Sequence, residues 1–245
     1  MDLRSKFGFG ERREVPLPSE EEFARLREEM VEKQIRRRGI ADGRVLAALL
    51  EVPRHEFVPE ELRAQAYDDK PLPIGESQTI SQPYMVASMT AALGLTGGLP
   101  RSDRGERVLE IGTGCGYQAA VLSRLAKEVY SIESRPPLAL AAQERLARLG
   151  YTNVHVHCGD GTLGLPECAP FDGILVTAAA PAVPAPLLEQ LAEGGRLVIP
   201  VGSEDHQELR LIRKSAGQIT SLVIEECRFV PLVGRHGWRE PSRND

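Results

Sequence analysis

Three glycines alternate with other residues in the segment EIGTGCGY (residues 110–117), which continues a short apolar run that begins at residue 107. Glycine lets a chain turn tightly and brings bare backbone close to a ligand, and the free amides at the start of a following helix attract electron-rich groups. The segment therefore predicts a nucleotide-type binding loop, with ligand contacts from Glu110, Gly112, Thr113, Gly114 and Gly116.

Carboxylates stand at the ends of the next two predicted strands. Glu133 ends the second apolar run, 21 residues after Gly112, and a carboxylate in that position can accept hydrogen bonds from both ribose hydroxyls of a nucleoside. Asp160 and Gly161 lie in the turn after the third run, where the carboxylate could meet an adenine amino group. The alternative is a plain strand–loop–helix turn with Glu133 on the surface. Three successive strand ends with suitable groups favour the binding site.

A glycine loop alone does not distinguish a nicotinamide site from an S-adenosylmethionine site. Glu110 favours the second, because a carboxylate beside the loop repels a pyrophosphate but suits a cationic sulfonium. The loop also lies more than 100 residues into the chain, and the sequence contains one such nucleotide unit. These features predict a class I methyltransferase core that uses S-adenosylmethionine and releases S-adenosylhomocysteine.

The segment after the predicted fourth strand indicates the methyl acceptor. Nitrogen methyltransferases that act on bases or amides often carry an Asn/Asp-Pro-Pro-aromatic motif there, whereas this sequence reads VTAAAP (residues 176–181). No general base is apparent in that segment either. A carboxylate nucleophile is already ionised at neutral pH and needs no base, so it fits the site.

The segment LPIGESQTISQPYMVASM (residues 72–89) is a second place where residues suited to chemistry gather. Pro83 suits the first turn of a helix that runs to about residue 93, so Ser81 or Gln82 is expected to cap this helix. A serine hydroxyl beside free amides at a helix start can bind an anion such as a substrate carboxylate. The simpler alternative is that Ser81 only caps the helix.

The remaining sequence predicts the fold that brings these strand ends together. From residue 107 apolar runs alternate with helical patterns, which predicts an α/β fold with a doubly wound, mostly parallel sheet. Alternating runs at residues 208–213 and 218–229 predict a C-terminal antiparallel hairpin that closes the sheet. Upstream, Ser19 and Glu22 form a capping-box signal for a helix to about residue 38.

The same patterns divide the chain into four regions. We expect a flexible N-terminal extension at residues 1–18, a helical N-terminal region with the active-site loop at 19–105, the methyltransferase core at 106–234 and a tail at 235–245. Proline-rich residues 53–82 are expected to form a long irregular loop. A helix at about residues 185–192 is expected to end at a glycine cap formed by Gly194 and Gly195.

Composition excludes several classes of function. The net charge of −5 argues against a broad electrostatic contact with nucleic acid. The four cysteines lack CxxC spacing, which excludes a zinc ribbon and suits a reducing cytosol. His155 and His157 share one face of what is expected to be a central strand, and packing there is expected rather than metal binding. With no signal peptide and no membrane-spanning run, the sequence predicts a cytoplasmic protein without a membrane partner.

Several of these segments together resemble one known family. The segment containing QTISQPY, with VPRHEFVP (52–59), AYDDKPLPIG (66–75), the glycine loop, PFDGILVTAAAP (170–181), GGRLVIPVG (194–202) and RFVPLVG (228–234), is similar to the protein-L-isoaspartate (D-aspartate) O-methyltransferase family. The resemblance covers about residues 25–234. It implies a Rossmann-like class I fold and methylation of the free α-carboxylate of L-isoaspartyl residues in damaged proteins. The ester then forms a succinimide, whose hydrolysis returns part of the material to L-aspartate.

The resemblance also implies roles for single residues. Ser81 matches the family's essential serine, Thr79 and Ile80 lie along the cofactor, Glu133 takes the ribose, and Asp160 with Gly161 takes the adenine edge. The partners it implies are isoaspartyl-containing proteins and peptides. We also expect a monomer without nucleic acid or metal.

Two other functions remain open from the sequence. The same core could methylate RNA or a small molecule. The acidic net charge and the missing base-binding motif argue against that alternative. The chain could also be a non-catalytic adaptor that binds isoaspartyl proteins. The intact glycine loop, Glu133 and Ser81 count against that alternative, since an adaptor could lose them freely.

Overall fold

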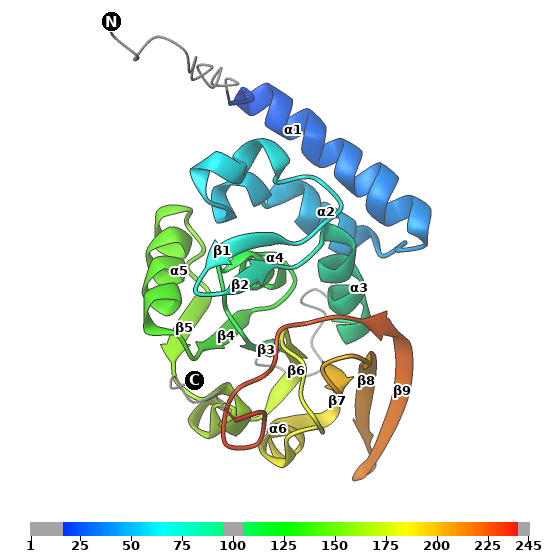
Figure 1. The fold of residues 1–245 in the computed structure, drawn as a ribbon. Helices are drawn as coiled ribbons and strands as arrows, with labels where there is room; N and C mark the ends of the chain where they lie inside the picture. The colour runs from blue at the N-terminus through cyan, green and yellow to red at the C-terminus, as the bar shows by residue number, and fades with distance from the viewer. Residues whose placement is uncertain (1–16, 96–104, 240–245) are drawn as a thin grey trace, which may run out of the picture.

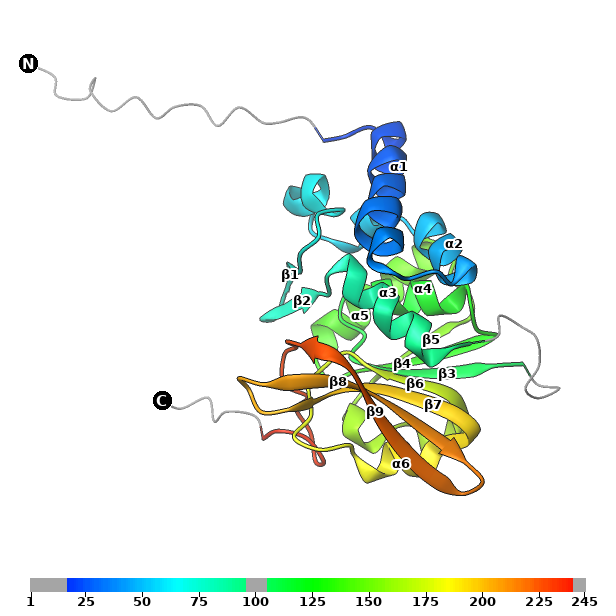
Figure 2. The same cartoon turned by 90° about the vertical axis from the view of Figure 1, so that its right-hand side faces the viewer.

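The computed structural model describes residues 17–95 and 105–239, and residues 1–16 of the expected extension and 240–245 of the expected tail lie outside them. Its centre is a seven-stranded sheet in the order β5-β4-β3-β6-β7-β8-β9 (Figures 1 and 2). Strands β3 to β7 pair in parallel, whereas β8 and β9 join in antiparallel. The strands are β3 (Arg107–Ile111), β4 (Glu128–Glu133), β5 (Val154–Cys158), β6 (Phe171–Val176), β7 (Leu191–Gly202), β8 (Gln207–Ser215) and β9 (Gln218–Cys227). The predicted mostly parallel sheet with a C-terminal antiparallel hairpin is confirmed.

Helices cover both faces of this sheet (Figure 2). Side chains alternate between the faces along a strand, so Val108 packs into the core under one helical layer and Leu109 into the core on the opposite face. The inner strands are therefore apolar on both sides, as parallel strands usually are. One face carries α3 (Pro83–Leu93), α4 (Tyr117–Ser123) and α5 (Pro136–Arg148), and the other carries α6 (Ala185–Gln190).

A further helical layer from the N-terminal part of the chain packs on α3 and α4 (Figure 1). It begins at the predicted capping box, in which the Ser19 hydroxyl accepts a hydrogen bond from the Glu22 amide and the Glu22 carboxylate accepts one from the Ser19 amide. The N-terminal helical segment is thus confirmed. Its elements are α1 (Glu20–Glu29), a π-helical turn (Met30–Ile35), a 3-10 turn (Arg36–Arg38), α2 (Gly43–Glu51) and the 3-10 helices Arg54–Phe57 and Glu60–Gln65.

The expectation of an irregular loop over residues 53–82 is wrong for its last part. There, β1 (Leu72–Gly75) and β2 (Gln78–Ile80) form a short antiparallel hairpin. Glu76 and Ser77 form its turn with φ values of +51° and +57°, a conformation that favours glycine or asparagine. The turn therefore carries no sequence signal. The hairpin leads directly into the start of α3.

Two other expectations about this framework are wrong. The residue after α6, Leu191, is extended and pairs with Phe171 of β6, so the chain enters β7 and runs through Gly194 and Gly195 without a glycine cap. Tertiary pairing overrides the local signal here. Strand β5 is an edge strand rather than a central one, and its His155 lies 2.7 Å from the Glu128 carboxylate.

Neither a metal centre nor a membrane span is found in the part of the chain that the structure describes. Within residues 17–95 and 105–239, no three His, Cys, Asp or Glu side chains are grouped to hold a metal ion. No helix in these ranges is long and apolar enough to cross a membrane.

Candidate active site

The glycine loop lies where β3 ends, and all three of its glycines have a positive φ. The φ values of Gly112, Gly114 and Gly116 are +95°, +53° and +89°, a backbone conformation that residues with a side chain rarely adopt. Space is a second constraint at Gly112, because a Cβ atom there would lie 2.3 Å from Thr177 Oγ1. The first glycine is therefore needed for the turn and for the close approach of the segment after β6.

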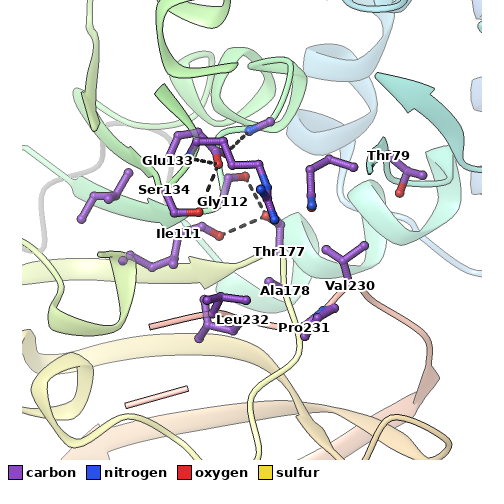
Figure 3. Close-up of a pocket in the computed structure, with 16 residues that line it drawn as sticks. Thr79, Ile111, Gly112, Glu133, Ser134, Thr177, Ala178, Val230, Pro231 and Leu232 are labelled. Carbon is purple, nitrogen blue, oxygen red and sulfur yellow. Dashed lines mark hydrogen bonds between the residues drawn. The ribbon is translucent and has the colours of Figure 1, made fainter. Parts of the chain in front are cut away.

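Glu133 ends β4 beside this loop and is 5% exposed. Its Oε2 atom accepts a hydrogen bond from the Gly114 amide at 2.8 Å, and its Oε1 atom accepts one from the Arg135 amide at 3.0 Å (Figure 3). A carboxylate can accept about four hydrogen bonds. Both oxygens therefore keep acceptor capacity for the ribose hydroxyls of a nucleoside.

Three neighbouring cavities meet at the carboxyl ends of the central strands. The glycine-loop cavity, about 630 Å³, lies between the ends of β3 and β4 and residues 230–233. The Ser81 cleft, about 1250 Å³, lies between the start of α3 and the end of β9, and a junction cavity of about 340 Å³ adjoins both. These volumes include space open to solvent. In the described ranges, only Thr79 and Thr177 line all three cavities.

Most of the predicted site residues line at least one of these cavities. Those that do are Thr79, Ile80, Ser81, Gly112, Thr113, Gly114, Glu133 and Gly161. Gly116 lies behind the loop, where a Cβ atom would come within 3.2 Å of Leu146 on α5. Glu110 and Asp160 also lie outside the cavity linings.

Ser81 lines both the Ser81 cleft and the junction cavity. It is not the N-cap of α3: Gln82 occupies that position, and no side chain caps the helix. Instead the Gln82 side-chain amide donates to the Asp69 carbonyl oxygen at 3.0 Å. The Ser81 hydroxyl is thus not used for capping, which removes the simpler interpretation of this serine.

The backbone at Ser81 is held by a buried arginine. Arg54 is fully buried, and its Nη2 atom donates to the Ser81 carbonyl oxygen at 2.8 Å while Nε donates to the Ala66 carbonyl oxygen at 2.7 Å. Burial lowers the pKa of its guanidinium group, although arginine stays protonated in proteins. Arg54 therefore joins two distant loop segments below the cleft.

Glu110 is fully buried behind the glycine loop. The Ser131 hydroxyl donates to its Oε2 atom at 2.5 Å and lies 2.6 Å from the Thr113 hydroxyl, while Glu110 Oε1 has no partner. Burial, and secondarily the nearby Glu133 charge, raise the pKa of Glu110 to about 8 against the effect of the Ser131 hydrogen bond. At neutral pH the group is mainly neutral, so it braces Thr113 rather than offering a charge to a cation.

Asp160 connects the loop after β5 to the C-terminal segment. Its Oδ1 atom accepts from the Thr162 amide at 2.9 Å and from the Thr162 hydroxyl at 2.7 Å, and its Oδ2 atom accepts from the Arg235 amide at 2.8 Å. Burial alone would raise the pKa of Asp160, but these hydrogen bonds outweigh it and lower the pKa. Oδ2 accepts this one hydrogen bond and so keeps further acceptor capacity.

Comparison with known proteins identifies the family. The family model for protein-L-isoaspartate (D-aspartate) O-methyltransferase matches residues 25–237. The chain belongs to this methyltransferase family. A protein-L-isoaspartate O-methyltransferase 2 of Marinobacter nauticus is 56% identical over 220 residues, which cover 89% of this chain and 97% of the relative. A protein-L-isoaspartate O-methyltransferase of Methanoculleus marisnigri is 54% identical over 215 residues, 88% of this chain and 94% of the relative.

Solved structures of the same family agree. A protein-L-isoaspartate O-methyltransferase superposes with a TM-score of 0.75 at 33% identity, covering 86% of this chain and 67% of the other. A putative enzyme of this name from Plasmodium falciparum, in complex with S-adenosyl-L-homocysteine, gives a TM-score of 0.71 at 27% identity over 84% and 98% of the two chains. The predicted family, the class I methyltransferase fold and the isoaspartate O-methyltransferase activity are confirmed.

Other residues of this methyltransferase line the glycine-loop cavity without having been predicted. Ser134 and Arg135 follow Glu133, and their place after a strand end was an available signal. Thr177 follows β6 in the same way. The residues after β9 likewise follow the end of a predicted strand, and Pro231 bridges to Ala179 beside the cavity. The unpredicted residues of this last group are Val230, Pro231, Leu232 and Val233.

Proposed function

We propose that the chain transfers the methyl group of S-adenosylmethionine to the α-carboxylate of L-isoaspartyl residues in damaged proteins and peptides. The ester leads to a succinimide and a partial return to L-aspartate, which is protein repair. One observation carries this proposal beyond family membership. The cavity with the nucleoside-binding groups meets the cleft with the free serine hydroxyl at Thr79 and Thr177.

The glycine-loop cavity suits S-adenosylmethionine in the chemistry of its walls. Glu133 has acceptor capacity for the ribose hydroxyls, and Gly112 and Gly114 present bare backbone to the cavity. Gly161 and the remaining acceptor capacity of Asp160 suit the adenine edge, while Thr79, Ile80, Thr113 and the loop backbone suit the amino-acid part. When bound, this cofactor supplies an electrophilic methyl group on a sulfonium, and S-adenosylhomocysteine is the product.

The Ser81 cleft suits an extended peptide. In our proposal the Ser81 hydroxyl donates a hydrogen bond to one oxygen of the substrate α-carboxylate and so orients the other oxygen toward the methyl group. The cleft wall includes Arg38, whose guanidinium lies 3.5 Å from the Tyr84 ring centroid and 3.0 Å from the Asp69 carboxylate. These contacts place a stacked Arg38–Tyr84 pair beside the proposed peptide path.

No base is required for the transfer. An α-carboxylate has a pKa of about 3.5 and is ionised at neutral pH. One carboxylate oxygen forms a bond to the methyl carbon while the carbon–sulfur bond breaks and the sulfur keeps the electron pair. Cys227 lines the same cleft, but burial and the charges of Glu225 and Glu208 raise its pKa to about 12, so it stays a neutral thiol.

After methylation the repair proceeds in the substrate. The backbone amide nitrogen of the next residue attacks the ester carbonyl, and methanol leaves as the succinimide ring closes. Water then opens the ring on either side, which gives a mixture of aspartyl and isoaspartyl products. Methanol release is therefore a direct consequence of methylation at this carboxylate.

We also propose that the chain works as a cytoplasmic monomer without a metal, nucleic acid or membrane partner. The acidic net charge of −5 supports the absence of a nucleic-acid partner. All four cysteines are free thiols, which suits a reducing compartment.

Methanol release from a short isoaspartyl peptide tests the proposed reaction, with its ordinary aspartyl twin as the control. The expected result is release from the isoaspartyl peptide alone. Release from neither peptide by a protein that binds S-adenosylhomocysteine would overturn the proposal, and would favour another acceptor or an adaptor.

A further inference from the structure

Thr177 occupies the point where the three cavities of the site meet. It follows the last residue of β6 and lines the glycine-loop cavity, the junction cavity and the Ser81 cleft. Figure 3 shows it beside Ile111 and Gly112, with dashed lines to both. Thr177 therefore borders the region that joins the first cavity to the cleft.

The hydrogen bonds of Thr177 determine what its side chain offers to a ligand. Its hydroxyl oxygen lies 2.7 Å from the Gly112 carbonyl oxygen and 3.0 Å from the Ile111 carbonyl oxygen. Carbonyl oxygens only accept, so the threonine hydroxyl must be the donor. Its single proton is thus directed into the glycine loop, and the oxygen presents only lone pairs in other directions.

We propose that Thr177 Oγ1 is a hydrogen-bond acceptor for the methyl group of the sulfonium cofactor and aligns this methyl group toward the Ser81 cleft. The inference rests on the proposed function. A sulfonium withdraws electrons from its methyl group and makes the methyl hydrogens positive, so that an oxygen lone pair attracts them. Because the protein holds this oxygen in place before the reaction, the alignment requires no reorganisation.

This role differs from a purely structural one in a measurable way. S-adenosylmethionine carries the methyl group and the positive charge, whereas S-adenosylhomocysteine has neither. An acceptor for the methyl group therefore stabilises the first ligand and not the second. A bond that only braces Gly112 affects both ligands to the same extent.

Calorimetric titration of the full chain with both ligands tests the proposal. Thr177→Val keeps the shape of the side chain and removes the oxygen, whereas Thr177→Ser keeps the oxygen. We expect the valine variant to lose roughly two- to fivefold more affinity for S-adenosylmethionine than for S-adenosylhomocysteine. Its kcat for methyl transfer should fall by about tenfold. The serine variant should keep the wild-type ratio of the two affinities.

The control is Thr220→Val, at an exposed threonine on β9 that lines none of the cavities, and it should bind both ligands as the wild type does. Equal losses for both ligands in Thr177→Val would overturn the inference, as would a serine variant that behaves like valine. If the valine variant does not fold, Thr177→Ala provides the same comparison. A wild-type chain that binds neither ligand would instead overturn the proposed function.

Discussion

The glycine-loop cavity and the Ser81 cleft adjoin each other but are assembled differently. The polar groups of the cavity come mainly from the ends of successive strands, where Gly114 and Glu133 contact each other directly. The cleft instead combines Arg38, Ser81 and Glu225, which lie far apart in the sequence. More than 100 residues separate Ser81 from Glu225. The difference suggests two separable tasks: cofactor binding by a local strand-end motif, and substrate orientation by tertiary assembly.

The largest expected effect falls on the cleft alone. Ser81→Ala removes the hydroxyl that orients the α-carboxylate, so kcat should fall by about 10²-fold or more. The affinity for S-adenosylhomocysteine, measured by calorimetry, should stay near the wild-type value. Ser221→Ala, at an exposed serine on β9, is the control and should keep full turnover. Unchanged turnover in Ser81→Ala would remove the serine from the mechanism.

A change in the cavity should have the opposite profile. Glu133→Ala removes the acceptor for the ribose hydroxyls and for the Gly114 amide, so S-adenosylmethionine affinity should fall by about 10- to 100-fold. Calorimetry measures this loss, and kcat at saturating cofactor should change much less. An unaltered dissociation constant would show that Glu133 only supports the loop.

A smaller effect is expected where the C-terminal segment meets the cavity. Asp160→Asn weakens the hydrogen bond from the Arg235 amide. The segment that contains Val230 and Leu232 is then held less tightly against the cavity, so the cofactor should bind more weakly. We expect S-adenosylhomocysteine to dissociate roughly three- to tenfold faster in stopped-flow measurements. The inosine analogue lacks the adenine amino group from which Asp160 is proposed to accept a hydrogen bond, so its dissociation should change less. An equal change for both compounds would indicate that Asp160 acts only through Arg235.

The smallest effect on activity is expected behind the glycine loop, where Glu110→Gln should leave turnover at pH 7 nearly unchanged. The pKa of Glu110 is raised from 4.5 to about 8 in the folded chain. Between these pH values the folded state keeps a proton that the unfolded state has lost, so stability falls as pH rises through this window. Glutamine does not titrate, and the melting temperature of the variant should decline less from pH 4.5 to pH 8. Identical pH profiles would show that Glu110 is ionised.

The sequence predicted the strand-end part of the site because the relevant signals are local. Apolar runs place Gly112 and Glu133 at neighbouring strand ends, and parallel pairing then brings them together. The capping box at Ser19 was predicted for the same reason. Glu110 shows the limit of this reasoning, because its residue type suggests a charge but burial raises its pKa.

The remaining features depend on tertiary contacts that no local pattern reveals. The turn at Glu76 and Ser77 uses positive φ values without glycine, so the β1–β2 hairpin was missed. Pairing of Leu191 with Phe171 extends β7 through two glycines. The sequence did not predict Thr177 as a site residue, because a single threonine in VTAAAP forms no motif. Its importance comes from the cavities that meet around it.

The most direct test of the account is to locate the transferred methyl group. An isoaspartyl peptide is incubated with the chain and methyl-¹³C-labelled S-adenosylmethionine, quenched in acid to preserve the ester, and analysed by tandem mass spectrometry and NMR. The account predicts one labelled methyl ester, on the α-carboxylate of the isoaspartyl residue, and none on the aspartyl twin. A label on nitrogen, on another carboxylate or equally on both peptides would contradict it.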